Sequence, residues 1–203
     1  TGGVALSNTV NVDNYDGGPI TGICAGDFGT WYVFKWTGVY KMVRTGDDAR
    51  AYDVVTTSKR VGAILGSIVR GVDEHGASVI YFLDPRFGPT RLGPGGPQAL
   101  VGLRTTWGRV NLQAGSVVAR AAFYPYKQQV HWWLAVDGAD RPNFKIILQV
   151  SEIQPAEGGA MWRGWSVSTC RSTEAAAVAV LTEVVSINGV SSLSERPFIG
   201  LTT

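Results

Sequence analysis

The run Val79-Ile80-Tyr81-Phe82-Leu83 places five large apolar side chains in succession between turn residues. An apolar run of four to eight residues bounded by turns is typical of a strand that is buried on both faces. A sheet built around such a strand must be covered by neighbours on both sides. Three further runs have the same character: Trp31-Tyr32-Val33-Phe34, Val130-His131-Trp132-Trp133-Leu134-Ala135-Val136 and Ala176-Ala177-Val178-Ala179-Val180-Leu181.

Each run follows a less hydrophobic β-prone segment, and the four segments begin about 48 residues apart along the chain. They are Ile20–Ala25, Ile68–Val72, Val117–Ala122 and Trp165–Cys170. This interval is typical of the blades of a β-propeller. We therefore predict an all-β, β-propeller-like fold of about four antiparallel blades, either complete or as an arc of a larger ring. The prediction is a single domain over 1–203, with a leading strand or arm at 1–19 and repeats near 20–67, 68–116, 117–164 and 165–203.

The remaining strands are less evenly marked. Third strands are expected at Trp36–Val43, Phe87–Leu92 and Asn143–Leu148, and fourth strands at Tyr52–Thr56 and Leu100–Arg104. The third repeat offers no clear fourth strand. Ser172–Val185 contains three consecutive alanines that favour a helix, but its valines and its place in the repeat favour a strand. A β-sandwich also has many short strands and remains the alternative fold, although it gives no reason for the steady interval.

The composition indicates a surface that is either largely neutral or covered by a partner. Of 203 residues only 17% are charged, the net charge is +2, and Trp, Tyr and Phe occur seven times each. No run of basic residues exceeds Lys59-Arg60, and no apolar run has the length of a membrane span. Cys24 and Cys170 are expected to be free, half-buried thiols, as in a reducing compartment. The start at Thr1 and the end at Leu201-Thr202-Thr203 indicate a processed product or a piece of a longer chain.

The sequence predicts no metal site and no activated nucleophile. His75 and His131 are the only histidines, and neither has a ligand partner at metal-binding spacing. We expect His75 at a solvated loop tip, and His131 packed on the strand face opposite Trp132. The stretch Asp13–Gly17 resembles the start of a calcium loop but lacks the downstream glutamate, which favours a turn. No Gly-x-Ser-x-Gly motif occurs, and Cys24 has no convincing histidine partner.

Four aspartates are candidate catalytic acids, because several propeller families hydrolyse glycosides. Asp27, Asp53, Asp84 and Asp137 each lie beside a predicted strand end, where each also suits a turn. Hydrolysis needs two carboxylates a few ångströms apart, which a sequence cannot show. The stretch Gly93–Pro97 lacks the Lys-Ser/Thr ending of a phosphate loop and is expected to be a surface loop. We therefore predict a non-enzyme with no catalytic residues and no cofactor.

Tryptophans offer the other candidate binding surface. They can form core packing between sheets or a platform for a sugar or a protein partner. Adjacent residues of one strand face opposite sides, so Trp132 and Trp133 suit a strand that is covered on both faces. The core interpretation is preferred, and a glycan-binding platform stays open. The full set is Trp31, Trp36, Trp107, Trp132, Trp133, Trp162 and Trp165.

Three stretches resemble blade phrases of tailed-bacteriophage virion structural proteins. They are Val79–Leu92, Gln129–Val136 with Arg141-Pro142-Asn143, and Ser194–Thr202. The resemblance covers about residues 20–203. It rests on motifs of strands and turns and not on active-site signatures, so it carries over no catalytic or ligand-binding residue. It implies a neck or tail-hub component of the virion that docks against copies of itself and other virion proteins, without a membrane and without sequence-specific nucleic-acid binding. The alternatives are a carbohydrate-binding propeller and, less favoured, a glycoside-acting enzyme.

Overall fold

The computed structural model describes residues 10–13, 18–47, 50–112, 119–140, 142–156, 159–162, 165–169, 175–187 and 190–201. Side chains are described up to Ile153, apart from those of Arg50, Val101, Arg104 and Thr105. Within these ranges the chain is all-β, which confirms the predicted class. The helical elements are single turns: α1 (Arg104–Trp107), η2 (Pro125–Lys127) and η3 (Val150–Glu152). None of the described helices is long and apolar enough to cross a membrane.

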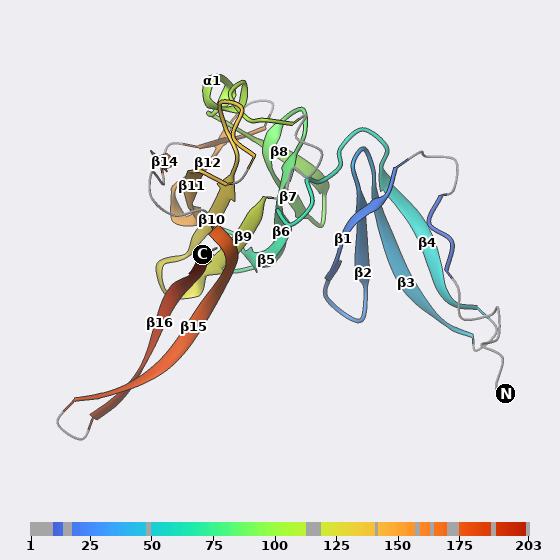
Figure 1. Ribbon diagram of the computed structural model, residues 1–203. Helices are drawn as coiled ribbons and strands as arrows, with labels where there is room; N and C mark the ends of the chain where they lie inside the picture. The colour runs from blue at the N-terminus through green and yellow to red at the C-terminus, as the bar shows by residue number, and fades with distance from the viewer. Residues whose placement is uncertain are drawn as a thin grey trace, which may run out of the picture.

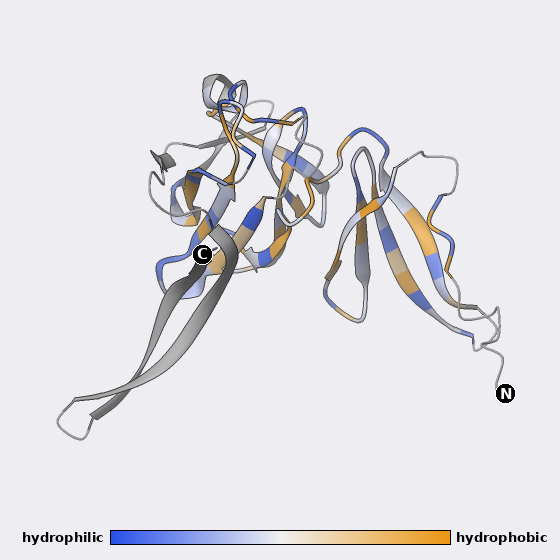
Figure 2. Cartoon of the chain, in the orientation of Figure 1, coloured by the Kyte–Doolittle hydropathy of each residue, from blue (hydrophilic) through white to orange (hydrophobic). Residues whose placement is uncertain are grey.

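The first sheet is an antiparallel meander in which each strand pairs with the next along the chain. Its strands are β1 (Ile20–Ala25), β2 (Trp31–Lys35), β3 (Val39–Asp47) and β4 (Arg50–Ser58). Hydrophobic and hydrophilic bands alternate along β3 (Figure 2). Such alternation fits strands whose two faces meet different surroundings.

The second sheet repeats this meander and then gains a hairpin. Its strands β5 (Val69–Val72), β6 (Ser78–Asp84), β7 (Gly88–Gly93) and β8 (Gly96–Val101) pair in sequence order. A hairpin of β12 (Ile153–Ala156) and β13 (Gly159–Trp162) adds to the far edge, where β13 runs parallel to β8. The stretch Gly93–Pro97 forms the tight β7–β8 connection, with Pro94 and Gly95 exposed at its turn. It is therefore a surface turn, as expected.

The third sheet has the order β14-β11-β10-β9. Its strands are β9 (Arg120–Tyr124), β10 (Gln129–Leu134), β11 (Phe144–Gln149) and β14 (Trp165–Thr169). The chain leaves this sheet after β11, adds β12 and β13 to the second sheet, and returns as β14. Two long strands, β15 (Ala175–Ile187) and β16 (Val190–Leu201), then pair only with each other and extend from the body as an arm (Figure 1).

The sheets stack through their first strands. β5 lies between β1 and β9, and β15 lies beside β9 on the other side, so the row of neighbours is β1, β5, β9, β15 (Figure 1). The first strands of the three sheets, β1, β5 and β9, begin at Ile20, Val69 and Arg120, close to the expected interval. None of these sheets closes on itself, so the order of the stack is shown but a propeller is not.

The fourth expected repeat is wrong. Trp165–Thr169 does not open a new sheet, because it pairs with β11 as the edge strand of the third sheet. The segment with three alanines is a strand, as preferred, but it belongs to the two-stranded arm rather than to a four-stranded blade. One fourth strand also differs, because β8 ends at Val101 and α1 begins at Arg104. The first residues of the segment predicted at Val117–Ala122 lie outside the described ranges.

β6 contributes to two hydrophobic cores at once. Val79, Tyr81 and Leu83 join the core shared with the third sheet. Ile80 and Phe82, which point the other way, join the core shared with the first sheet, where the rings of Phe82 and Phe34 are 5.1 Å apart. All five side chains are buried. This arrangement confirms that the apolar run is a strand covered on both faces.

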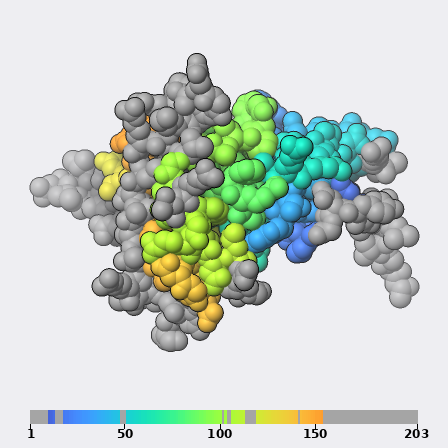
Figure 3. Space-filling view, turned by 90° about the horizontal axis from the view of Figure 1, so that it is seen from above, coloured from blue at the N-terminus to red at the C-terminus, as the bar shows by residue number. Residues whose placement is uncertain are grey.

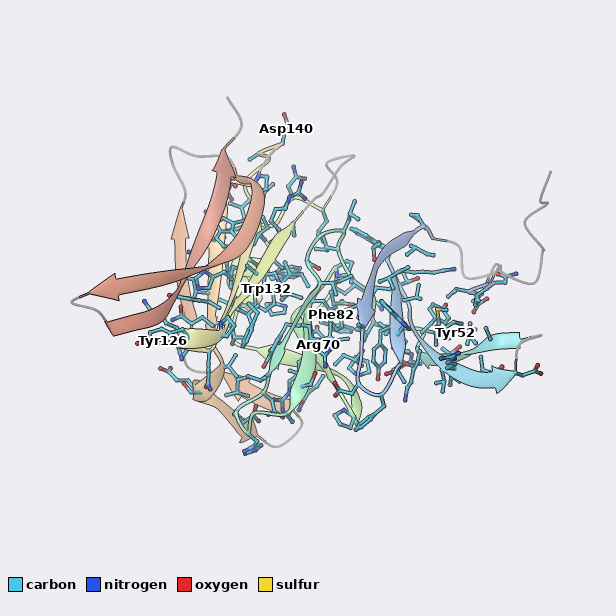
Figure 4. The ribbon with its side chains drawn as sticks, turned by 90° about the horizontal axis from the view of Figure 1, so that it is seen from below. Tyr52, Arg70, Phe82, Tyr126, Trp132 and Asp140 are labelled. Atoms are coloured by element: carbon cyan, nitrogen blue, oxygen red, sulfur yellow. The ribbon has the colours of Figure 1, made fainter. Side chains whose placement is uncertain are left out.

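β10 is covered on both faces as well. Val130, Trp132 and Leu134 enter the core with the second sheet, where Trp132 meets Tyr81 edge to face at 6.5 Å. The indole Nε1 of Trp132 donates to the carbonyl oxygen of Ser67 at 2.9 Å, which ties the third sheet to the loop before β5. Figure 4 shows Phe82 and Trp132 in successive layers between the sheets. The aromatic residues therefore fill the spaces between sheets.

Replacing Phe82 by Ala should lower the free energy of unfolding by about 3–5 kcal/mol, because it opens a cavity at the contact of the first two sheets. Urea denaturation monitored by circular dichroism measures this change. The control is Tyr126→Ala, whose side chain is 78% exposed, and its effect should stay within about 0.5 kcal/mol. Equal losses for the two variants would contradict the burial of Phe82 between the first and second sheets.

Candidate functional site

Asp84 has a structural role at the end of β6. Its carboxylate is fully buried and accepts hydrogen bonds from the backbone N–H groups of Gly62, Arg86 and Phe87, each at 2.8 Å. These bonds fix the turn into β7 and hold the loop that joins the first and second sheets. All three bonds come from the backbone, so this carboxylate is a turn former.

The other three candidate acids are spread over the first and third sheets. Asp137 follows β10 with a left-handed φ of 55° and forms a two-pronged ion pair with Arg109, the closer contact being 2.5 Å. The hydrogen bond from Arg109 lowers the pKa of Asp137. Asp27 lies in the β1–β2 loop and pairs with Arg70, while Asp53 lies within β4 opposite Val43. Nothing in these contacts assembles the pair of carboxylates that glycoside hydrolysis needs.

The two histidines lie where the sequence predicted. His75 is exposed in the β5–β6 turn, where its backbone N–H donates to Asp73 at 2.9 Å. His131 is buried on the face opposite Trp132, with Nε2 3.0 Å from the side-chain oxygen of Gln129 and the ring against Tyr124 and Trp133. Burial, with help from Lys145 and Lys127, lowers its pKa to about 4. His131 is therefore neutral at physiological pH.

Only some of the residues considered for metal binding or as free thiols lie within the described ranges. The described residues contain no group of three or more His, Cys, Asp or Glu side chains that could hold a metal ion. Asp13 contacts Lys35, Tyr40 and Lys59, whereas residues 14–17 of the calcium-like stretch lie outside the described ranges. Cys24 is a free, half-buried thiol whose pKa is raised by burial, as expected. Cys170 lies outside the described residues.

Most of the tryptophans that can be judged belong to the core. Trp107, Trp132 and Trp133 are buried, and Trp36 packs at the edge of the core. Trp31 differs, because 42% of it is exposed on the outer face of the first sheet. The side chains of Trp162 and Trp165 are outside the described set. The core interpretation thus holds for three residues, and Trp31 is the exception.

A hollow that the sequence did not predict lies at the end of the second sheet next to α1. It encloses about 730 Å³ and is lined mainly by Phe87, Pro89, Leu100, Leu103 and Trp107. Its rim carries Arg86, whose guanidinium lies 5.3 Å from the ring centre of the half-exposed Phe87. We call this site the Phe87 hollow. The surface at this end, seen from above, is shown in Figure 3.

Two features shape the Phe87 hollow. The indole Nε1 of Trp107 donates to the carbonyl oxygen of Pro85 at 3.2 Å, which holds the ring against the β6–β7 turn. Gly88 has a φ of +79°, and a Cβ there would approach Trp107 to 3.0 Å. Glycine is therefore required for the close approach of turn and indole. An apolar pocket of this size with one cation at its edge suits an apolar group that is next to a negative charge.

A second hollow, of about 430 Å³, lies at the opposite end of the second sheet beside the β7–β8 turn. Its polar side chains are satisfied within the fold, because Arg91 pairs with Glu74 at 2.6 Å and donates to Gln98 at 2.9 Å. The arrangement leaves the Phe87 hollow as the better candidate site.

Comparison with known proteins identifies no relative. No protein-family model matches the chain, and no curated protein matches it either.

The stability of the fold should fall as the pH is lowered from about 6.5 to about 4, in part because of His131. Its pKa is lower in the folded chain than in the unfolded one, so protonation in this window favours unfolding. His131→Gln should reduce the pH dependence by at most about 3 kcal/mol. Urea denaturation at a series of pH values measures it, with the exposed His75→Gln as control. Identical pH profiles for wild type and His131→Gln would contradict the buried neutral imidazole.

Proposed function

We propose that this chain is a non-enzymatic structural module of a bacteriophage particle, located in the virion, which docks through contacts with copies of itself and other virion proteins. In this proposal the sheets of the chain are blade-like layers of a propeller-like stack. The observation that supports it most is the outer face of the first sheet, where the stack ends with apolar residues exposed.

That outer face has the character of the faces buried within the stack. Trp31 and Ile23 are 42% and 58% exposed, and they flank the buried Val33 on the side of the sheet opposite Phe34. The chain covers comparable faces twice, once between the first and second sheets and once between the second and third. The occupant that fits best is therefore another sheet of the same kind, supplied by a second copy.

The composition and the site chemistry agree with this role. Interface centres are depleted of charged residues and enriched in aromatic ones, which matches the 17% charge and the aromatic content of this chain. Among the aspartates weighed as acids, Asp84 fixes a turn through backbone hydrogen bonds, and Asp27 and Asp137 pair with arginines. The assignment to a phage particle rests on the resemblance of Val79–Leu92, Gln129–Val136 and Ser194–Thr202 to virion proteins.

Carbohydrate binding is the second candidate, and the exposed Trp31 is the observation that favours it. Aromatic faces can stack on sugar rings as well as on a protein partner. The two functions differ in the response of tryptophan fluorescence to glycans. A change that is lost in Trp31→Ala would favour the carbohydrate-binding function over self-docking at this face.

Sedimentation velocity should show the wild-type mass rising with concentration in the micromolar range. Replacing Ile23 and Trp31 together by Ser should weaken this association by roughly 10-fold or more, because two apolar side chains leave the contact. The control is Val55→Ser, an equally exposed position on the other face of the first sheet. A wild-type chain that stays monomeric at every concentration would contradict the proposed function.

A further inference from the structure

Phe28 is an exposed aromatic side chain at the tip of the β1–β2 loop. Its relative exposure is 105%, and its backbone has a left-handed φ of 53°. This conformation is uncommon for bulky residues and costs free energy, and exposure of the ring to water gives nothing in return. Both costs are offset if the ring is buried against a partner.

The loop that carries Phe28 is held in place by its own hydrogen bonds. The backbone N–H of Gly26 donates to the carbonyl oxygen of Thr30 at 2.9 Å, and the Thr30 N–H donates to that of Asp27 at 3.1 Å. The carboxylate of Asp27 pairs with Arg70 on β5. A fixed loop loses little conformational entropy on binding, so the ring is preorganised to insert.

The Phe87 hollow is complementary to this loop in shape and charge. Its walls are apolar and its volume of about 730 Å³ is ample for a phenyl ring. Arg86 at the rim pairs with no acidic side chain within the part of the chain that the structure describes. The carboxylate of Asp27 is half-exposed and pairs with Arg70 through Oδ1, so a ring that enters the hollow directly after it would bring Oδ2 of Asp27 to the Arg86 rim while the Arg70 contact persists.

The loop and the hollow lie at opposite ends of the second sheet. Asp27 pairs with Arg70, whose Nε donates to Ser78 at 3.0 Å, so the loop is next to the first residue of β6. Arg86 and Phe87 follow the last residue of β6. Seven residues of strand separate the two ends by roughly 20 Å. In Figure 1 the β1–β2 loop accordingly lies at the lower end of the first sheet and α1 lies at the top of the picture, so Phe28 cannot reach its own hollow.

We propose that Phe28 of one copy inserts into the Phe87 hollow of the next copy, with Asp27 beside Arg86. The inference rests on the proposed self-docking function and deepens it by naming a second, head-to-tail contact. Because the two surfaces differ, each copy keeps a free loop and a free hollow, and the contact propagates into a ring or a filament. This direction is distinct from docking at the face that bears Trp31.

The test uses two variants that each retain one half of the contact. Phe28→Ala removes the ring and keeps the hollow, while Phe87→Asp keeps the ring and places a carboxylate at the rim. Both replaced side chains are exposed, so the fold should persist, and circular dichroism checks it. Each variant alone should self-associate roughly 10- to 100-fold more weakly than wild type in sedimentation velocity. The control is Tyr126→Ser, which removes another strongly exposed aromatic side chain.

A mixture of the two variants tests whether the contact is head to tail. The Phe87→Asp chain still offers Phe28 to the intact hollow of the Phe28→Ala chain, so the mixture should reach a greater mass than either variant alone. No gain on mixing, or wild-type association of Phe28→Ala, would overturn the inference while leaving the proposed function standing if the wild type self-associates. A monomeric wild type would instead remove the proposed function itself.

Discussion

The structure depends on the burial of both faces of β6. A strand with five consecutive large apolar side chains cannot leave either face in water, so its sheet needs a neighbour on each side. The first sheet supplies one cover through Phe34, and the third sheet supplies the other through Trp132. The stacking order follows from this requirement, and the loops and helical turns lie at the ends of the strands.

The same requirement supports the proposed docking of copies. A stack of sheets that each need two neighbours must end somewhere, and its first end exposes Trp31 and Ile23. At the other end β15 and β16 form a two-stranded arm beside β9. An isolated hairpin is marginally stable in water, so the arm also gains from a partner surface. Contacts between copies would continue, from one chain to the next, the sheet-on-sheet packing found within each chain.

The sequence predicted what depends on local pattern. β2, β6 and β10 were found because their apolar runs are continuous, and His131 and Trp132 were placed on opposite faces by strand alternation alone. The fourth repeat failed because strand pairing is not local: β14 returns to the third sheet only after the chain has added a hairpin to the second. The Phe87 hollow was not predicted for the same reason: its walls come from a turn, a strand and α1, and only the folded chain brings these segments together.

Side chains of facing strands hold the sheets together, and a double-mutant cycle between Phe34 and Phe82 tests this contact most directly. The rings are 5.1 Å apart and tilted by 57°. Urea denaturation of Phe34→Leu, Phe82→Leu and the double variant should give a coupling energy of about 0.5–1.5 kcal/mol. Additive effects within about 0.3 kcal/mol would contradict the stacked arrangement.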